Sequence, residues 1–169
     1  MTVAEFDALP EADARERLTA CCAAAPWVTA MLAARPWRDR DEMLAAASRA
    51  WAALSHAELG AAIAHHPRLG ESCAAATLTA RERQWSQHEQ AGAGAAGDDA
   101  RAALAEGNAE YERRFGYTFI LFASGRSAED MLAALRARLE NEPGTERVIT
   151  AEELRKITLS RLEKLLADA

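Results

Sequence analysis

The sequence has few of the residues that favour β-strands and few that could form disulfides. Half of its 169 residues are hydrophobic, but many of these are alanine, whereas valine and isoleucine are scarce. Alanine is the best helix former, and β-branched residues favour strands. Only three cysteines occur, and adjacent Cys21 and Cys22 with distant Cys73 match neither a disulfide framework nor a zinc site. We therefore predict an all-α fold with cysteines as small core or surface residues.

The sequence also lacks an excess of positive charge and any long apolar run. Its formal net charge is −6, which argues against a nucleic-acid partner because such a partner usually requires a basic face. No apolar stretch approaches the roughly 20 residues that span a bilayer. The first nine residues do not show the basic-then-apolar pattern of a secretory signal. We expect a cytoplasmic protein that binds neither nucleic acid nor a membrane.

Helical patterns follow one another along most of the chain. Apolar spacing and capping signals predict helices over residues 11–25, 27–34, 41–54, 55–64, 79–90 and 98–115, and helices that begin at 127 and at 150. Three of these starts carry a capping box, formed by Ser55 and Glu58, Thr79 and Glu82, and Thr150 and Glu153. The length suits one domain. The prediction is a single domain over residues 1–169, an irregular bundle of roughly seven to nine helices.

The connections between these helices are less uniform. A residue before proline is pushed out of the helical region, so a corner is predicted at His66–Pro67, followed by a loop over residues 68–78. The alanine- and glycine-rich stretch 91–97 is interpreted as a linker. Residues 117–122 form the only run that favours an extended structure, and we expect a buried extended connection. Residues 141–144 are expected to end the helix that starts at 127.

Three features of the sequence could carry chemistry. Ser86, Glu89 and Gln90 are spaced i, i+3 and i+4, so their polar side chains share one helix face, which taken alone would be a solvated surface. Arg161 falls on the apolar stripe of the last helix, where a buried guanidinium requires an acceptor or anion. His66 would be fixed at its corner, and histidine exchanges protons readily near neutral pH. Taken alone, it could simply be a favourable charge at a helix end.

Seven stretches resemble the OHCU decarboxylase family, where OHCU is 2-oxo-4-hydroxy-4-carboxy-5-ureidoimidazoline. In order they are PWVTAMLAARPW (26–37), AHHPRLGE (64–71), WSQHEQAGA (85–93), NAEYERRFGYTFIL (108–121), GRSAEDML (125–132), RARLENEPGTE (136–146) and ITLSRL (157–162). Each stretch is modest alone, but chance would hardly place seven in this order. Many family members have Asp and then Leu-Ala-Gly after the His-Pro pair, where this chain has Arg68 to Glu71. The family histidine corresponds to His66, because it directly precedes Pro67.

The resemblance implies a carboxy-lyase of purine catabolism that converts OHCU into (S)-allantoin during urate degradation. It implies that His66 and Glu89 are catalytic, with His66 as the acid–base residue. The substrate-binding residues that it implies are Pro67, Ser86, Gln90, Phe119, Ile120, Leu121, Phe122, Ala123 and Arg161. In the 119–123 stretch we expect backbone groups to be used, because an extended segment leaves them free. No cofactor and no metal are expected, because the substrate carries its own electron sink.

Other interpretations remain open from the sequence. A helical interaction module without catalytic activity would explain the amphipathic helices, but not the joint occurrence of His66, Arg161 and the Ser86/Glu89/Gln90 face. If the chain is an enzyme, these five residues should converge on one pocket. A metal-binding bundle that uses His65, His66, His88 and Glu89 matches no standard ligand spacing. A homodimer is a further possibility if Trp37 and Trp51 are exposed, whereas buried they would belong to the core.

Overall fold

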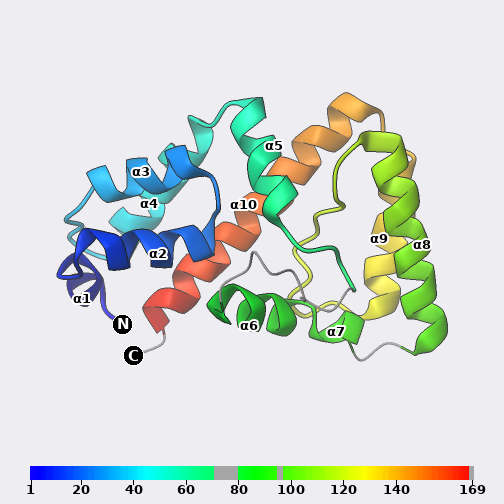
Figure 1. Cartoon of the computed structure of the whole chain (residues 1–169), viewed down its shortest axis with the longest axis horizontal. Coiled ribbons are helices and arrows are strands. Elements are labelled where there is room, and N and C mark those ends of the chain that lie inside the picture. The colour runs from blue at the N-terminus through cyan, green and yellow to red at the C-terminus, as the bar shows by residue number, and fades with distance from the viewer. Residues whose placement is uncertain (71–79, 95–96, 168–169) are drawn as a thin grey trace. The chain divides into compact units, whose positions relative to one another are not determined.

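The computed structural model describes residues 1–70, 80–94 and 97–167. These residues form ten helices and no strand, which confirms the predicted all-α class (Figure 1). The helices are α1 (Val3–Asp7), α2 (Glu11–Cys21), α3 (Ala25–Ala33), α4 (Arg40–Ala52), α5 (His56–His65), α6 (Ala80–Glu89), α7 (Ala91–Gly94), α8 (Asp98–Phe115), α9 (Ala128–Leu139) and α10 (Pro143–Ala167). None of them combines the length and apolarity of a bilayer span.

The chain divides into two compact units. Unit 1 comprises Met1–Ala62 and Arg155–Ala169, and unit 2 comprises Ile63–Leu154. The helix α10 contributes to both, because its first part belongs to unit 2 and its last part to unit 1. That the whole chain acts as a single domain stays a prediction.

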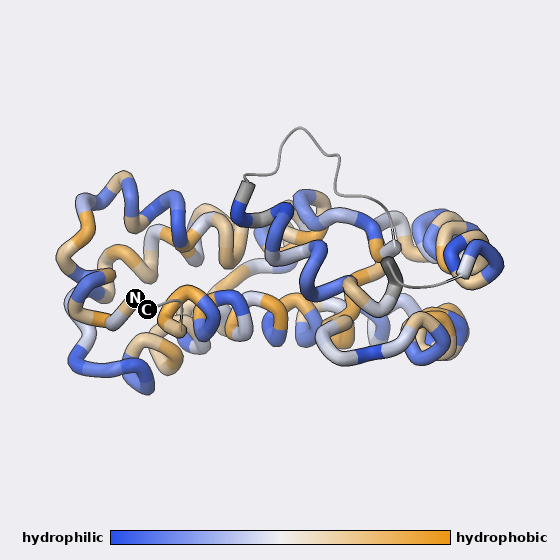
Figure 2. Tube along the Cα trace, turned by 90° about the horizontal axis from the view of Figure 1, so that it is seen from below, coloured by the Kyte–Doolittle hydropathy of each residue, from blue (hydrophilic) through white to orange (hydrophobic). Residues whose placement is uncertain are grey.

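Unit 1 is built from α1 to α4, most of α5 and the end of α10. α3 packs against both α2 and α4, and the indole Nε1 of buried Trp27 donates to the Ala47 carbonyl at 3.0 Å. Hydrophobic positions recur between hydrophilic ones along the helices, as expected for amphipathic segments (Figure 2). Trp37 and Trp51 are buried in this core, at 5% and 8% exposure, and therefore lend no support to a homodimer.

Unit 2 is organised around α8 and α9, which lie side by side (Figure 1). The two helices approach so closely at Gly107 that a Cβ there would lie 2.5 Å from Leu135 Cδ2. The core of this unit consists of eight buried residues: Leu69, Leu104, Tyr111, Phe119, Leu121, Ala123, Met131 and Leu135. The predicted extended connection after α8 therefore contributes directly to this core.

Several helix starts agree with the predicted capping signals. Ser55 and Glu58 bond reciprocally, with Ser55 N–H donating to Glu58 Oε2 at 2.7 Å, and Ser127 begins α9 as the N-cap of a capping box. α8 ends at Phe115, and Gly116 follows in the left-handed conformation at φ +79°. The predicted cap at Thr79 lies outside the described residues.

Two predictions about the connections are wrong. The last helix begins at Pro143 and not at Thr150, because proline suits the first helical position and Glu146 suits the first turn. The first part of the 91–97 stretch is the short helix α7 and not a linker. A Cβ at Gly92 would lie 2.0 Å from the Arg126 carbonyl oxygen, so this segment packs closely against the start of α9.

Candidate functional site

The predicted corner at His66 is present in unit 2. α5 ends at His65, and the backbone N–H of His66 donates to the Ile63 carbonyl at 3.0 Å. The imidazole is half-buried, and its Nδ1 lies 3.3 Å from the Pro67 carbonyl oxygen. The proline prevents helix continuation, so that the ring of His66 stands at the start of the loop.

The loop that follows the corner is held by side chains of α8 and by Gln90, which follows α6. Asn108 Nδ2 donates to the Leu69 carbonyl at 2.8 Å, and this asparagine is 2% exposed. The Gly70 N–H donates to Gln90 Oε1 at 2.8 Å. Arg68 forms a two-pronged ion pair with Glu112, at 2.7 and 2.6 Å. These bonds fix the backbone that carries His66 and Pro67.

The polar face of α6 is buried and not solvated. Ser86 is 1% exposed and Glu89 is 5% exposed, whereas His88 points to solvent as expected. Gln90 follows the last residue of α6, and its Nε2 donates to Ser86 Oγ at 3.2 Å. Since its Oε1 accepts from Gly70, Gln90 links the polar face of α6 to the loop after His66. A buried carboxyl such as Glu89 is a functional candidate because burial of a charged group is costly.

The 119–123 segment runs between α8 and α9, and four of its five residues are buried: Phe119, Ile120, Leu121 and Ala123. Part of its backbone is already engaged. The Ile120 carbonyl accepts from Arg138 at 2.6 Å, and the Phe122 N–H donates to Glu153 Oε2 at 2.8 Å. Arg126 contacts the carbonyls of Phe122 and Ala123. The expectation that the whole segment keeps its polar groups free is therefore too broad.

Phe119 and Leu121 differ from the other three residues of this segment. In the part of the chain that the structure describes, the N–H and C=O groups of these two residues make no hydrogen bond. A donor and an acceptor on one residue match the adjacent N–H and C=O groups of a ureido or amide compound. Both residues offer backbone groups to a ligand, and Leu121 lies between the two held residues Ile120 and Phe122.

Arg161 belongs to unit 1 and lies on α10. It is 6% exposed, and its Nη1 lies 3.4 Å from the Ala20 carbonyl oxygen. The apolar stripe predicted around it is present, because Leu154, Ile157 and Leu165 are all buried. Burial raises the pKa of the nearby Cys22 thiol, and the charge of Arg161 acts in the opposite direction. The convergence of Arg161 with the unit 2 residues stays a prediction.

Sequence reasoning missed a buried polar network in unit 2, centred on Arg138 and Glu146. Arg138 is 7% exposed and Glu146 is completely buried. The signal was available, because Arg138 follows Met131 and Leu135 at helical spacing and so lies on the apolar face of α9. Arg161 was singled out because a guanidinium on an apolar stripe requires a buried acceptor or anion, and the same reasoning applies to Arg138.

Unit 1 contains a groove of ≈ 590 Å³, lined by both acidic and basic side chains, among them Asp7, Glu11, Arg15 and Arg35. None of the residues predicted to bind substrate lines it. Among residues 1–70, 80–94 and 97–167, no group of three or more His, Cys, Asp or Glu side chains is arranged to hold a metal ion.

The fold and these contacts define an all-helical protein with a buried carboxyl on α6, a helix face that Gln90 links to the loop after the His66 corner. The sequence model of the OHCU decarboxylase family matches residues 7–163, and the chain belongs to this family. It is 29% identical over 148 residues to the uric acid degradation bifunctional protein TTL of Arabidopsis thaliana, covering 88% of this chain and 46% of that protein.

Two further relatives extend the comparison. Identity to the 2-oxo-4-hydroxy-4-carboxy-5-ureidoimidazoline decarboxylase of Amia calva is 38% over 104 residues, covering 60% of this chain and 57% of that protein. A crystal structure of OHCU decarboxylase in the presence of (S)-allantoin superposes with a TM-score of 0.76 at 29% identity, covering 89% of this chain and 96% of that chain. The chain thus spans about half the length of these two curated relatives.

Proposed function

We propose that this protein decarboxylates OHCU to (S)-allantoin in urate degradation, without a cofactor. The observation that carries the proposal is the burial of Ser86 and Glu89 on α6, with Gln90 bonding this face to the loop that follows His66. Family membership over residues 7–163 supplies the reaction class. A helical interaction module gives no reason to bury a carboxyl and a hydroxyl in this position.

The proposed reaction breaks the bond between the ring carbon and its carboxylate. CO₂ leaves, and the electron pair is delocalised into the adjoining carbonyl or imine of the substrate itself. The enzyme must stabilise this developing anion and then deliver one proton to one face of the carbon. Delivery from a fixed side yields a single enantiomer of the product.

In this proposal His66 engages the substrate hydroxyl or carbonyl and manages the proton. Glu89 accepts a hydrogen bond from the ring nitrogen or hydroxyl and polarises the reacting centre. Ser86 and Gln90 hold the ureido group and ring oxygens, Pro67 shapes the pocket beside the imidazole, and the 119–123 segment contributes backbone groups. Arg161 orients an oxygen or the carboxylate through its fork of donors.

The assay generates the unstable substrate in place, from urate with urate oxidase and hydroxyisourate hydrolase, and follows circular dichroism with a chelator present. We expect (S)-allantoin to appear faster than by spontaneous decay. The His66→Asn variant should lose most of its turnover and keep its fold, because asparagine fits the corner but does not exchange protons near neutral pH. Near-normal turnover of this variant would contradict the role of His66.

Two finer points belong to the same proposal. A cytoplasmic location is supported by Cys21 and Cys22, which are free thiols in the core. The partner is a small ureidoimidazoline and not a nucleic acid, in keeping with the net charge of −6. Homodimerisation is tested by the same purified sample through its mass in solution.

A further inference from the structure

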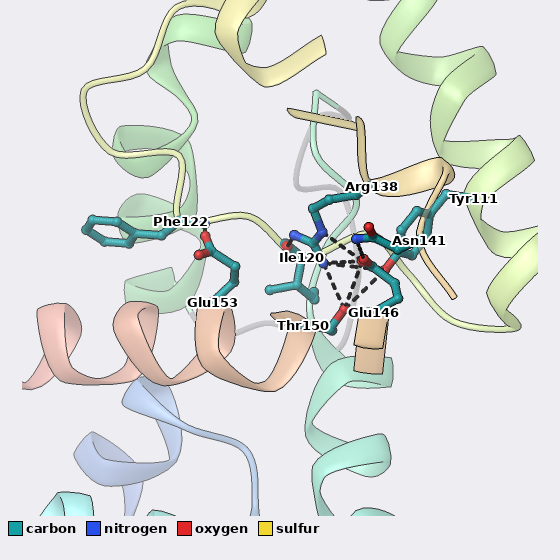
Figure 3. Close-up of polar contacts among 8 residues, drawn as sticks. All are labelled: Tyr111, Ile120, Phe122, Arg138, Asn141, Glu146, Thr150 and Glu153. Atoms are coloured by element: carbon teal, nitrogen blue, oxygen red, sulfur yellow. Dashed lines mark hydrogen bonds and ion pairs between the residues drawn. The ribbon is translucent and has the colours of Figure 1, made fainter. Parts of the chain in front are cut away.

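Arg138 connects the core of unit 2 to the backbone of the 119–123 segment (Figure 3). Its Nη1 donates to the Ile120 carbonyl at 2.6 Å, and its guanidinium carbon lies 4.6 Å from the centre of the Phe119 ring. One arginine therefore contacts two consecutive residues of this segment, one through the backbone and one through the ring face.

The guanidinium is itself held in one orientation. Nε donates to Glu146 Oε1 at 2.7 Å, and Nη2 donates to Thr150 Oγ1 at 2.8 Å. Glu146 also accepts from Asn141 Nδ2 at 2.7 Å and from the Tyr111 hydroxyl. Since Glu146 and Thr150 are both completely buried, the donor directed at Ile120 has little freedom to move.

Glu153 holds the segment at a second point. It lies one turn after Thr150 on the same face of α10, is 7% exposed, and accepts from the Phe122 N–H at 2.8 Å. Figure 3 shows Glu153 reaching Phe122 and Arg138 reaching Ile120. Thus the backbone is held on both sides of Leu121, whose own N–H and C=O make no hydrogen bond within the described residues.

We propose that Arg138 and Glu153 are positioning residues for the substrate site. They act through the backbone: by fixing Ile120 and Phe122, they set where the polar groups of Leu121 stand when a ureido group binds. This inference rests on the proposed function. Neither side chain need touch the substrate, so their loss should weaken binding more than it slows the chemical step.

Glu153 allows the sharper test, because its replacement leaves the ion pair between Arg138 and Glu146 intact. In Glu153→Ala, KM should rise about tenfold and kcat should fall by less than about threefold. Glu153→Gln keeps an oxygen that accepts from Phe122, and should restore KM to within about twofold of the original. Glu5→Ala is the matched control, because Glu5 accepts a similar bond from the Thr2 N–H at 2.7 Å in unit 1.

Hydrogen exchange of the Phe122 amide supplies a readout that needs no substrate. We expect exchange to quicken about tenfold in Glu153→Ala and to stay near the original rate in Glu153→Gln and Glu5→Ala.

Arg138→Lys tests the other positioning residue. A single ammonium cannot bond to both Glu146 and Ile120, so KM should rise as in Glu153→Ala, provided that thermal melting shows a folded protein.

Three outcomes would overturn the inference. An unchanged KM in Glu153→Ala, with faster amide exchange, would mean that the bond between Glu153 and the Phe122 amide does not govern substrate binding. Unchanged exchange would mean that Glu153 does not hold Phe122. A KM that Glu153→Gln fails to restore would mean that the charge matters and not the hydrogen bond. If the unsubstituted protein does not decarboxylate OHCU, the proposed function fails, and amide exchange still decides whether the two residues hold the segment.

Discussion

Arg138 in unit 2 and Arg161 in unit 1 are the two arginines that the described part of the chain buries, at 7% and 6% exposure. They contact different groups. Arg138 bonds to the Glu146 carboxylate, the Thr150 hydroxyl and the Ile120 carbonyl. Arg161 lies on an apolar stripe of α10, where Nη1 is 3.4 Å from the Ala20 carbonyl and the Cys22 thiol is nearby.

This difference separates two uses of a buried guanidinium. A completely buried carboxylate offsets the charge of Arg138, and the short bonds around it make the group part of the architecture. Arg161 shares a buried face of α10 with Leu154, Ile157 and Leu165, and a charge-assisted bond to an anionic ligand is strong in a buried setting. We therefore expect substitutions at Arg138 to act mainly on stability and those at Arg161 mainly on catalysis.

The largest expected effect is on the stability of Arg138→Met. The substitution leaves the Glu146 carboxylate buried without its cation, which should lower the free energy of unfolding by about 3–5 kcal/mol. Urea unfolding, followed by far-ultraviolet circular dichroism, measures this loss.

The control for Arg138 is the double variant Arg138→Met/Glu146→Gln, which removes both charges. It should recover more than half of the lost stability, because the buried charge, and not the missing contacts, dominates the cost. A double variant as unstable as the single one would show that contacts to Ile120 and Thr150 matter more than charge balance.

The other side of the comparison is tested by Arg161→Met. Methionine keeps the packing of the aliphatic stem but loses the bond to the Ala20 carbonyl, so the free energy of unfolding should fall by about 1–2 kcal/mol, less than in Arg138→Met. Loss of charge-assisted bonds to substrate should lower kcat/KM by roughly 10- to 150-fold. Steady-state assays with OHCU generated in place, together with urea unfolding, give both numbers.

Arg161→Lys sharpens this result. A lysine keeps the charge but loses the planar fork, so partial activity would indicate that the charge dominates, and activity as low as that of Arg161→Met would indicate that geometry dominates. A large loss of stability in Arg161→Met with unchanged kcat/KM would mean that Arg161, like Arg138, acts mainly on stability.

The sequence predicted the helices better than the contacts between them. Periodic spacing and capping residues placed most helices correctly, because both signals are local. The start of α10 was wrong because Thr150 and Glu153 look like a capping box, yet they are buried and bond to Arg138 and to the backbone of Phe122. Polar side chains at helical spacing fit a cap and a tertiary anchor equally well.

The candidate site shows the same limit. Helical spacing and the corner before Pro67 singled out His66, Ser86, Glu89 and Gln90, and the family resemblance implied their roles. The structure links Gln90 to Ser86 and to the loop after His66. That Ser86 and Glu89 are buried could not be derived from helical spacing, which gives one shared face but not what covers it. Helical spacing could have singled out Arg138 but not its partners, because Tyr111 lies on α8 and Glu146 and Thr150 lie on α10, and only the tertiary fold brings them together.

The smallest expected effect concerns Tyr111, which donates to Glu146 beside Arg138. Burial, and then the bond to Glu146, raise the pKa of its hydroxyl above the ordinary value of 10.0. A hydroxyl whose pKa is higher in the folded than in the unfolded protein contributes its full stability below the unfolded-state pKa. This contribution is lost as the pH rises through the folded-state pKa. Tyr111→Phe should therefore be less stable by about 1–2 kcal/mol at pH 7 to 9. The difference should shrink above about pH 10, because unfolding then releases the tyrosine proton. Urea unfolding of both proteins at pH 8, 9 and 10.5 measures it. A constant difference would show that the Tyr111 hydroxyl titrates alike in the folded and unfolded chains, and that the network around Arg138 is open to solvent.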